Sequence, residues 1–392
     1  MAEMTTEVVP EIAELAGTMI EWRHDIHAHP ELGFQETRTA DFVASELTAY
    51  GLDVTRGVGG TGIVATLRNG DGGGSVGLRA DMDALPIKEA NDFAYRSQNE
   101  GRMHACGHDG HTSMLLGAAK YLAATRRFSG TVHFIFQPAE EGLGGARAML
   151  EDGLFERFPC DAVFGMHNWP GLPVGEFAVR SGPMMAGGAF FDVDITGKGS
   201  HGARPEASVD PVVVASHVIA ALQSIAARNV SPRETVVLSV TQVHAGDAYN
   251  VIPQTARLSG TVRAFSREVM SLVEQRMRDL TAGIAEGFGA RAELDFRTVF
   301  APTVNDGKES EFAAGICSEL VGAERVRRGP PLIMASEDFS FMLEQVPGCY
   351  VNVGNGTAGS EVHNPGYDFN DDALVYGASF YARLVERRLS AE

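Results

Sequence analysis

The chain has few cysteines, four among 392 residues. Cys106, Cys160, Cys317 and Cys349 form no Cys-x-x-Cys pair, and four thiols are too few to provide a disulfide framework for a chain of this length. The last three stand among apolar residues, which is typical of small buried side chains. The sequence therefore excludes a disulfide-stabilised scaffold and leaves Cys106 as the thiol in chemically unusual surroundings.

Positive charge is also scarce. The 32 Lys and Arg residues against 51 Asp and Glu residues give a formal net charge of −19, which repels nucleic acid and anionic membrane surfaces. Residues 1–16 lack the basic and apolar segments of a secretion signal, and no stretch approaches the ~18 apolar residues needed to cross a bilayer. We therefore expect a cytoplasmic protein that binds neither nucleic acid nor membrane.

The composition is that of an ordinary globular protein, 44% hydrophobic and 21% charged, and the chain is long enough for two domains. Up to about Gly182 short apolar strands alternate with helices, and the alternation returns after Pro302. This pattern predicts an α/β fold with an open sheet covered by helices on both faces. The Asp-Gly-Gly-Gly turn at 71–74 is expected to join strands 62–67 and 76–80 as a hairpin-like connection.

The middle of the chain has a different order of elements. Strand, helix, strand, strand, helix and strand are predicted at 190–196, 211–227, 235–244, 254–265, 267–288 and 291–299. This βαββαβ order is that of a ferredoxin-like domain, and Asp210 and Ser266 are placed to cap its two helices. The predicted organisation is a discontinuous α/β domain, residues 1–184 and 300–392, interrupted by an inserted domain, residues 185–299.

Residues Cys106 to His111 read Cys-Gly-His-Asp-Gly-His. A thiol, two imidazoles and a carboxylate so close together are not typical of an apolar core, whereas these groups bind transition metals. The helical pattern of 112–122 places the cluster at the entrance of a helix, where backbone N–H groups favour anionic ligands. The stretch therefore indicates half of a metal site.

The other half is expected beyond the carboxyl ends of the strands, where open α/β sheets bind ligands. Glu140 and Glu141 follow one predicted strand, His167 follows another, and His363 lies in a later loop of the same kind. A mixed set of nitrogen, oxygen and sulfur donors can hold two divalent ions with one bridging atom. The candidate metal ligands are Cys106, His108, Glu141, His167 and His363.

The adjacent carboxylates Glu140 and Glu141 distinguish a catalytic site from a structural one. They would repel each other unless cations hold them, and a structural zinc needs four ligands and no spare base. We assign Glu141 to the metal and Glu140 to a general base that takes a proton from water and gives it to a leaving amine. Taken alone, a Glu-Glu pair in a loop is more often two solvated charges, but its position after a buried strand favours catalysis.

Other polar residues have less specific surroundings. Asp83 follows strand 76–80, and Asp83, Asp109 and His111 are expected to orient metal-bound histidines, whereas Asp81 and His104 are left unassigned. The remaining histidines are more often structural or surface residues, and no catalytic role is assigned to His24, His27, His133, His217 and His244.

The inserted domain offers a glycine-rich loop, residues 197–202, that contains His201. Such a loop could cradle a ligand or be an ordinary turn, and the local sequence does not decide between them. Asn250 and Arg263 could offer an amide donor and a bidentate partner for a carboxylate.

Together these motifs resemble the metal-dependent amidohydrolases of the zinc peptidase type, which include hippurate hydrolase, N-acyl-amino-acid amidohydrolases and plant auxin-conjugate hydrolases. The resemblance runs nearly end to end. Its motifs are His29-Pro30-Glu31, Arg79 to Pro86, Cys106 to His111, Pro138 to Gly142, Gly165 to Asn168, Gly199-Ser200-His201, Ser336 to Phe339, and His363 with Tyr367 to Asn370.

The resemblance implies a metal pair held by the five candidate ligands, with Cys106 replacing the bridging aspartate of related aminoacylases and peptidases, and Glu140 as the general base. In such enzymes the histidine matching His201 often reaches the partner subunit's active site and stabilises the tetrahedral oxyanion. Asn250 and Arg263 match positions that hold the substrate carboxylate. The discontinuous domain would be catalytic, and the inserted domain would act as a lid and dimerisation domain of a homodimer.

The leading interpretation is metal-dependent hydrolysis of the amide bond of a small-molecule N-acyl amino acid, which yields a carboxylic acid and a free amino acid. It requires two divalent ions per subunit, drawn from zinc, manganese, cobalt or nickel. One alternative is a metallo-dipeptidase or aminopeptidase, which would need a carboxylate to receive the substrate ammonium group. Another is a non-catalytic protein with structural metals, with which the spare Glu140 is at odds.

Overall fold

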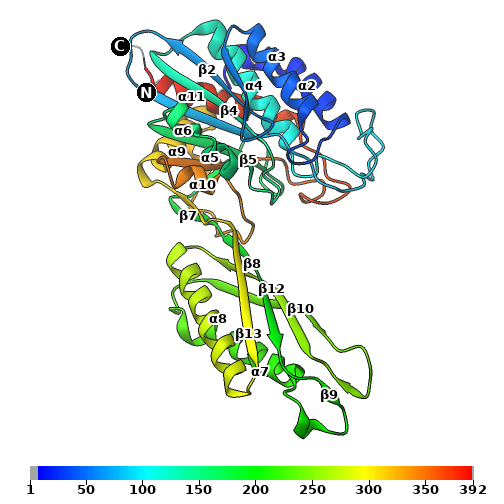
Figure 1. The fold of residues 1–392 in the computed structure, drawn as a ribbon. Helices are drawn as coiled ribbons and strands as arrows, with labels where there is room; N and C mark the ends of the chain where they lie inside the picture. Colours follow the sequence, from blue (N-terminus) through cyan, green and yellow to red (C-terminus); the bar gives the residue numbers. More distant parts are fainter. Residues whose placement is uncertain (1–7, 391–392) are drawn as a thin grey trace. The chain divides into compact units, whose positions relative to one another are not determined.

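The computed structural model describes residues 8–390, which divide into two compact units (Figure 1). The larger unit comprises the described residues up to Gly182, Val304–Pro331 and those from Asp338 onward. The smaller unit comprises Pro183–Thr303 and Leu332–Glu337. The chain leaves the larger unit at β7 (Gly182–Met185) and returns at β14 (Thr303–Asn305).

The short segment Leu332–Glu337 lies outside the predicted insertion but belongs to the smaller unit. Backbone hydrogen bonds explain this placement, because Ala186 N donates to Ile333 O at 2.9 Å and Ile333 N donates to Met184 O at 3.0 Å.

The larger unit is built on an eight-stranded mixed sheet with the order β1-β2-β4-β3-β5-β16-β6-β15. Its central strands β4, β3, β5 and β16 run parallel to one another. The strands are β1 (Asp53–Val58), β2 (Gly62–Asn69), β3 (Ser75–Asp81), β4 (Gly130–Gln137), β5 (Ala162–Trp169), β6 (Phe177–Val179), β15 (Val326–Arg328) and β16 (Gly348–Gly354). This mixed sheet, flanked by helices, confirms the predicted α/β fold class.

The predicted hairpin-like connection between β2 and β3 is wrong. Both strands form, but β4 lies between them, antiparallel to β2 and parallel to β3. The turn at 71–74 therefore joins two strands that do not pair. The pairing depends on β4, which enters the sheet about fifty residues later in the chain.

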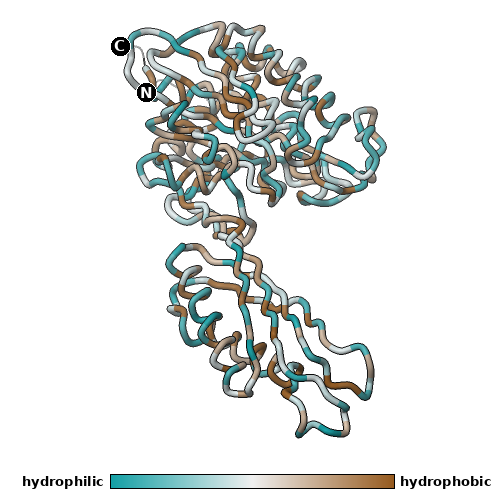
Figure 2. The backbone as a smooth tube through the Cα atoms, viewed as in Figure 1, coloured by the Kyte–Doolittle hydropathy of each residue, from teal (hydrophilic) through white to brown (hydrophobic). Residues whose placement is uncertain are grey.

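Helices cover both faces of this sheet. They are α1 (Pro10–Ala13), α2 (Ala16–Ala28), α3 (Thr37–Ala49), α4 (His108–Thr125), α5 (Gly145–Glu151), α6 (Leu154–Arg157), α9 (Gly307–Val321), α10 (Ser340–Leu343) and α11 (Leu374–Arg388). Alternate residues of β4 face opposite sides: Val132, Phe134 and Phe136 join the core that includes α4 and α11, and Ile135 is also fully buried. Figure 2 shows hydrophobic segments running through these strands.

The smaller unit has the predicted βαββαβ order. Its elements are β8 (Gly187–Thr196), α7 (Pro211–Ser224), β10 (Val236–Ala245), β12 (Thr255–Ala264), α8 (Arg267–Gly287) and β13 (Arg291–Phe300), with the short strands β9 (Ser200–His201) and β11 (Val251–Ile252). The antiparallel sheet has the order β10-β12-β8-β13, and α7 and α8 share its apolar core. The predicted helix caps are confirmed, since Asp210 accepts from Val212 N and Ser266 from Val269 N.

The stretch Pro211–Asn229 forms a long helix of the smaller unit. By length and composition alone it is apolar enough to cross a membrane, with a mean hydropathy of 1.3. Within the smaller unit, Val214, Val218 and Leu222 of this stretch are fully buried in the core shared with the sheet. Packing therefore accounts for part of its apolar character.

Candidate functional site

The Cys106 cluster lies at the start of α4. The helix begins at His108, four residues earlier than the apolar pattern alone predicts, so His108 to His111 form its first turn. Gly107 precedes it with φ of 94°, and a Cβ at this position would lie 2.3 Å from Asn168 Oδ1. Only glycine combines this backbone conformation with so close an approach, and that approach brings the cluster against the end of β5.

The structure brings the five predicted metal ligands together. Donor atoms of Cys106, His108 and His167 lie within 4.8 Å of one another, and so do those of Cys106, Glu141 and His363. Cys106 Sγ is 3.3 Å from His167 Nε2, and His363 Nε2 is 3.2 Å from Glu141 Oε1. The two groups share Cys106, which therefore stands between two sets of donors.

Glu140 lies beside the same donors. It is 6% exposed, and its carboxylate lies within 4.8 Å of donor atoms of His108 and Glu141. Two carboxylates and an imidazole thus converge at the end of β4, where the predicted base and the predicted ligands were expected to meet.

The protonation behaviour of these donors fits a cation site. Burial and the neighbouring His111 hold the pKa of His167 well below its usual range, which keeps the imidazole in the neutral form that binds metals. Hydrogen bonds with Cys106 and Glu141 raise the pKa of His363 to about 10. The anionic groups therefore attract positive charge to this place, and a divalent ion would supply it by displacing protons.

The pKa shifts of Cys106 and His108 also fit a cation site. Burial and the nearby Glu141 raise the pKa of the Cys106 thiol, so a metal must displace its proton in order to bind. Burial lowers the pKa of His108, but Asp81 and the Cys106 sulfur raise it more, to well above its usual range. His108 Nε2 is buried and has no hydrogen-bond partner among residues 8–390. The donor set fits a metal.

Asp83 orients two parts of the site. His108 Nδ1 donates to the Asp83 carbonyl at 2.8 Å and lies 3.2 Å from Asp83 Oδ1, which leaves Nε2 directed at the donor cluster. Asp83 Oδ2 accepts from Glu141 N at 3.0 Å. These contacts are those expected of a residue that fixes metal ligands.

The two ring nitrogens of His111 contact Asp81 and Asn168 and none of the five proposed metal ligands. Its Nδ1 is 2.6 Å from Asp81 Oδ1, and its Nε2 is 2.7 Å from Asn168 Oδ1. Asp81 is fully buried and 2.7 Å from Arg79, so although burial raises its pKa, the charges of Arg79, His108 and His111 hold that pKa well below its usual range.

The sequence analysis assigns no role to Asp81 and does not predict its ion pair with Arg79. Residues two apart on a strand share a face, so an arginine and an aspartate on the buried strand β3 were a usable signal.

Asp109 contacts helix α2. Its Oδ2 is 2.8 Å from His27 Nδ1 and 3.3 Å from the Arg23 guanidinium, and all three side chains are fully buried. His27 Nε2 is in turn 3.1 Å from Glu89. His104, left unassigned, is also buried, and burial lowers its pKa to about 4. Asp109 thus ties the first turn of α4 to α2.

The His27 pair predicts a pH dependence of stability. Burial lowers the pKa of His27, but the hydrogen bonds with Asp109 and Glu89 outweigh it and raise the pKa from 6.5 to about 9. The contribution of protonated His27 to the free energy of unfolding is therefore complete below pH 6.5 and is lost as the pH rises through about 9. The shift corresponds to about 3 kcal/mol.

Urea unfolding of the wild type and of His27→Gln from pH 6 to pH 9.5 measures this effect. We expect the free-energy difference between the two proteins to shrink as the pH rises. A difference that stays constant across this range would contradict the assignment.

His201, Asn250 and Arg263 belong to the smaller unit. His201 on β9 pairs with Val251 on β11, and Gly202 N donates to the Asn250 carbonyl at 2.7 Å, so His201 and Asn250 lie on neighbouring segments. Both side chains are exposed. Arg263 on β12 is half-buried; its guanidinium is 2.5 Å from Thr261 Oγ1 and burial lowers its pKa.

Comparisons with known proteins match nearly the whole chain. The sequence model described as Peptidase family M20/M25/M40 matches residues 77–387. Hippurate hydrolase of Campylobacter jejuni is 43% identical over 382 residues, which cover 97% of this chain and 99% of that protein. N-acetylcysteine deacetylase of Bacillus subtilis is 40% identical over 376 residues, which cover 94% and 96%.

A solved structure matches over a similar length. The Bacillus subtilis YXEP protein, described as a dinuclear metal-binding peptidase from the M20 family, aligns with a TM-score of 0.84 at 35% identity and covers 96% of this chain and 99% of that chain.

Proposed function

The chain belongs to peptidase family M20/M25/M40 and is an amidohydrolase, and we propose that it hydrolyses N-acyl amino acids to a carboxylic acid and a free amino acid. The observation that carries the proposal is the position of Glu140, a buried carboxylate within 4.8 Å of His108 and Glu141 donor atoms. The names of the two relatives, a hippurate hydrolase and an N-acetylcysteine deacetylase, support an acylated amine as the substrate.

Cys106, His108, Glu141, His167 and His363 would hold two divalent ions, zinc, manganese, cobalt or nickel. The sharing of Cys106 between two donor groups supports a pair of ions, as does the dinuclear character of the Bacillus subtilis structure. When bound, such ions polarise a carbonyl and lower the pKa of water. Asp83 would hold His108 in the orientation that directs Nε2 at the ions.

Glu140 would act as general base and then as general acid. It takes a proton from the attacking water as the carbon–oxygen bond forms, and it gives that proton to the amide nitrogen as the carbon–nitrogen bond breaks. A carboxylate held beside the ligands but left out of the ligand set can perform both transfers without leaving the site.

The smaller unit would supply the remaining groups. We assign His201 to stabilisation of the tetrahedral oxyanion and Asn250 and Arg263 to the substrate carboxylate. The predicted homodimer would form through this unit, since β10 is an edge strand of its sheet and exposes Val237 and Val243. Light scattering of the purified protein measures the oligomeric state.

Matched substrates test the choice between an acylated and a free amine. We expect an N-acetyl or N-benzoyl amino acid to have a kcat/KM at least ~100-fold above that of the dipeptide with a free terminus, because an unpaired ammonium beside two cations costs several kcal/mol. Equal rates, or a preference for the free amine, would instead support the dipeptidase alternative.

A further inference from the structure

The backbone N–H groups of the two residues that flank Glu140 in the chain, Ala139 and Glu141, donate to buried carboxylates. Asp83 Oδ2 accepts from Glu141 N at 3.0 Å. On the other side, Glu36 Oε1 accepts from Ala139 N at 2.8 Å. Glu36 lies more than a hundred residues earlier in the chain, directly before α3, and has no part in the sequence-based assignment of the site.

The residue that Glu36 holds has a strained backbone. Ala139 has φ of 52°, one of four positive-φ residues other than glycine in the described chain, and such a conformation is unfavourable for a residue with a Cβ. Its carbonyl accepts from Gly145 N at 3.0 Å, and its side chain is fully buried. This backbone conformation sets the direction in which the next residue, Glu140, leaves the end of β4.

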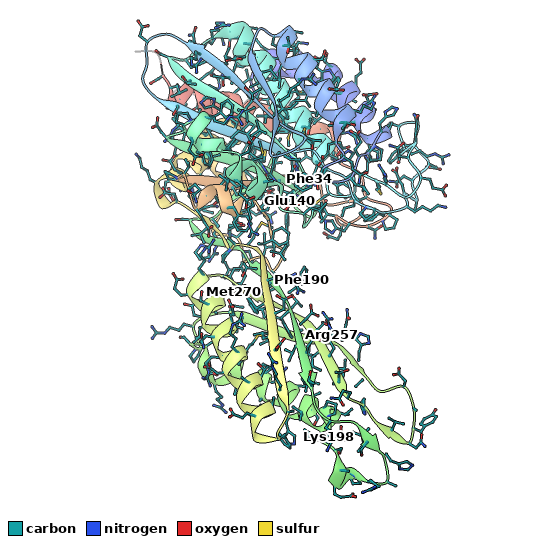
Figure 3. All side chains as sticks on the ribbon, in the orientation of Figure 1. Phe34, Glu140, Phe190, Lys198, Arg257 and Met270 are labelled. Carbon is teal, nitrogen blue, oxygen red and sulfur yellow. The ribbon has the colours of Figure 1, made fainter. Side chains whose placement is uncertain are left out.

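Glu36 is itself firmly placed. Its side chain is fully buried, and its Oε2 accepts from Thr61 Oγ1 at 2.5 Å. The loop before it packs directly on Ala139, because a Cβ on Gly33 would lie 3.0 Å from Ala139 Cβ. In Figure 3 the labels of Phe34, which belongs to this loop, and of Glu140 stand next to each other.

We propose that Glu36 is a positioning residue that holds the Ala139 peptide in its left-handed conformation and thereby aims the Glu140 carboxylate. This inference rests on the proposed function, in which Glu140 transfers the proton. The two side-chain hydrogen bonds of Glu36 go to Thr61 and Ala139 and to none of the five proposed metal ligands, so its loss should displace the base and leave metal binding intact.

Replacement of Glu36 should therefore lower kcat selectively. We expect Glu36→Ala to lose about 10- to 100-fold in kcat, since a displacement of about 1 Å has effects of this size, with KM and metal content unchanged. Glu36→Gln should retain most of the rate, because its amide oxygen can still accept from Ala139 N. Glu36→Asp, which is too short to reach both partners, should lose rate and serves if the alanine variant does not fold.

Relief of the backbone strain gives a second readout. Glycine adopts a positive φ without penalty, so Ala139→Gly introduced into Glu36→Ala should restore part of kcat. A role of Glu36 confined to the stability of the fold would show no such rescue.

The matched control is Glu31→Ala. Glu31 accepts from Arg38 N at 3.0 Å and from Thr39 N at 2.8 Å, so it caps α3 from the same loop with two backbone hydrogen bonds, whereas the Glu36 side chain accepts one. We expect it to lower the Tm to a similar extent and to leave kcat within about twofold. Unchanged kcat in metal-loaded Glu36→Ala and Glu36→Asp, or an equal loss in Glu31→Ala, would overturn the positioning role.

Measurement of Glu140→Gln in the same assay separates this inference from the proposed function. An inactive Glu140→Gln with a fully active Glu36→Ala removes only the role of Glu36. An active Glu140→Gln removes the base assignment itself, whatever the Glu36 variants do.

Discussion

Glu140→Gln is expected to lower kcat for an N-acyl amino acid by at least ~10³-fold, which is within the range that a positioned general acid and base contributes. Glutamine has the size of glutamate and fits the same buried place beside His108 and Glu141. It cannot accept the proton from water and so cannot return it to the leaving amine. Because Glu140 is not among the five proposed ligands, the metal content should stay at the wild-type value.

Steady-state kinetics together with elemental analysis of the same preparation measure both quantities. Glu141→Gln is the matched control, since it changes the neighbouring carboxylate in the same way but removes a proposed ligand, and it should lose bound metal as well as activity. A Glu140→Gln protein that keeps its metal and turns over at the wild-type rate would contradict the base assignment.

Cys106→Ala is expected to bind fewer than two ions and to lose about 10³-fold or more in activity. Cys106 is common to the two donor groups, so its removal would take a proposed ligand from both and weaken the binding of the ions that would polarise the substrate. The resemblance to enzymes with a bridging aspartate predicts that Cys106→Asp recovers part of both metal content and activity.

Metal content after gel filtration in a metal-free buffer tests this prediction. Cys349→Ala is the control, because Cys349 is a fully buried thiol on β16 that belongs to none of the donor groups found in the described chain, and it should retain two ions. Two ions in Cys106→Ala would show that the thiol does not bridge.

The sequence predicts the fold class and the ligand set for related reasons. Strands that are apolar throughout indicate a sheet covered on both faces, and the carboxyl ends of the parallel strands β3, β4 and β5 then meet at one edge. This rule predicts that Asp83, Glu141 and His167 belong to the site, because each lies at or shortly after the carboxyl end of one of these strands.

What the sequence does not predict depends on contacts between distant segments. The false pairing of β2 with β3 arises because local turn chemistry carries no information about β4. Buried pairs such as Glu36 with Ala139, or His27 with Asp109, leave no periodic signal, since an acidic or basic residue in a helix or loop is usually solvated. The surroundings that bury these groups form only when the chain has folded.

The most direct test of the central claim is a titration of the metal-free protein with zinc, manganese, cobalt or nickel while hydrolysis of N-benzoylglycine is measured. We predict no hydrolysis without metal and a rate that reaches its maximum at two ions per chain. Full hydrolysis in protein that holds no metal, or none after two ions have bound across a panel of N-acyl amino acids, would contradict a dimetal N-acyl amino acid hydrolase.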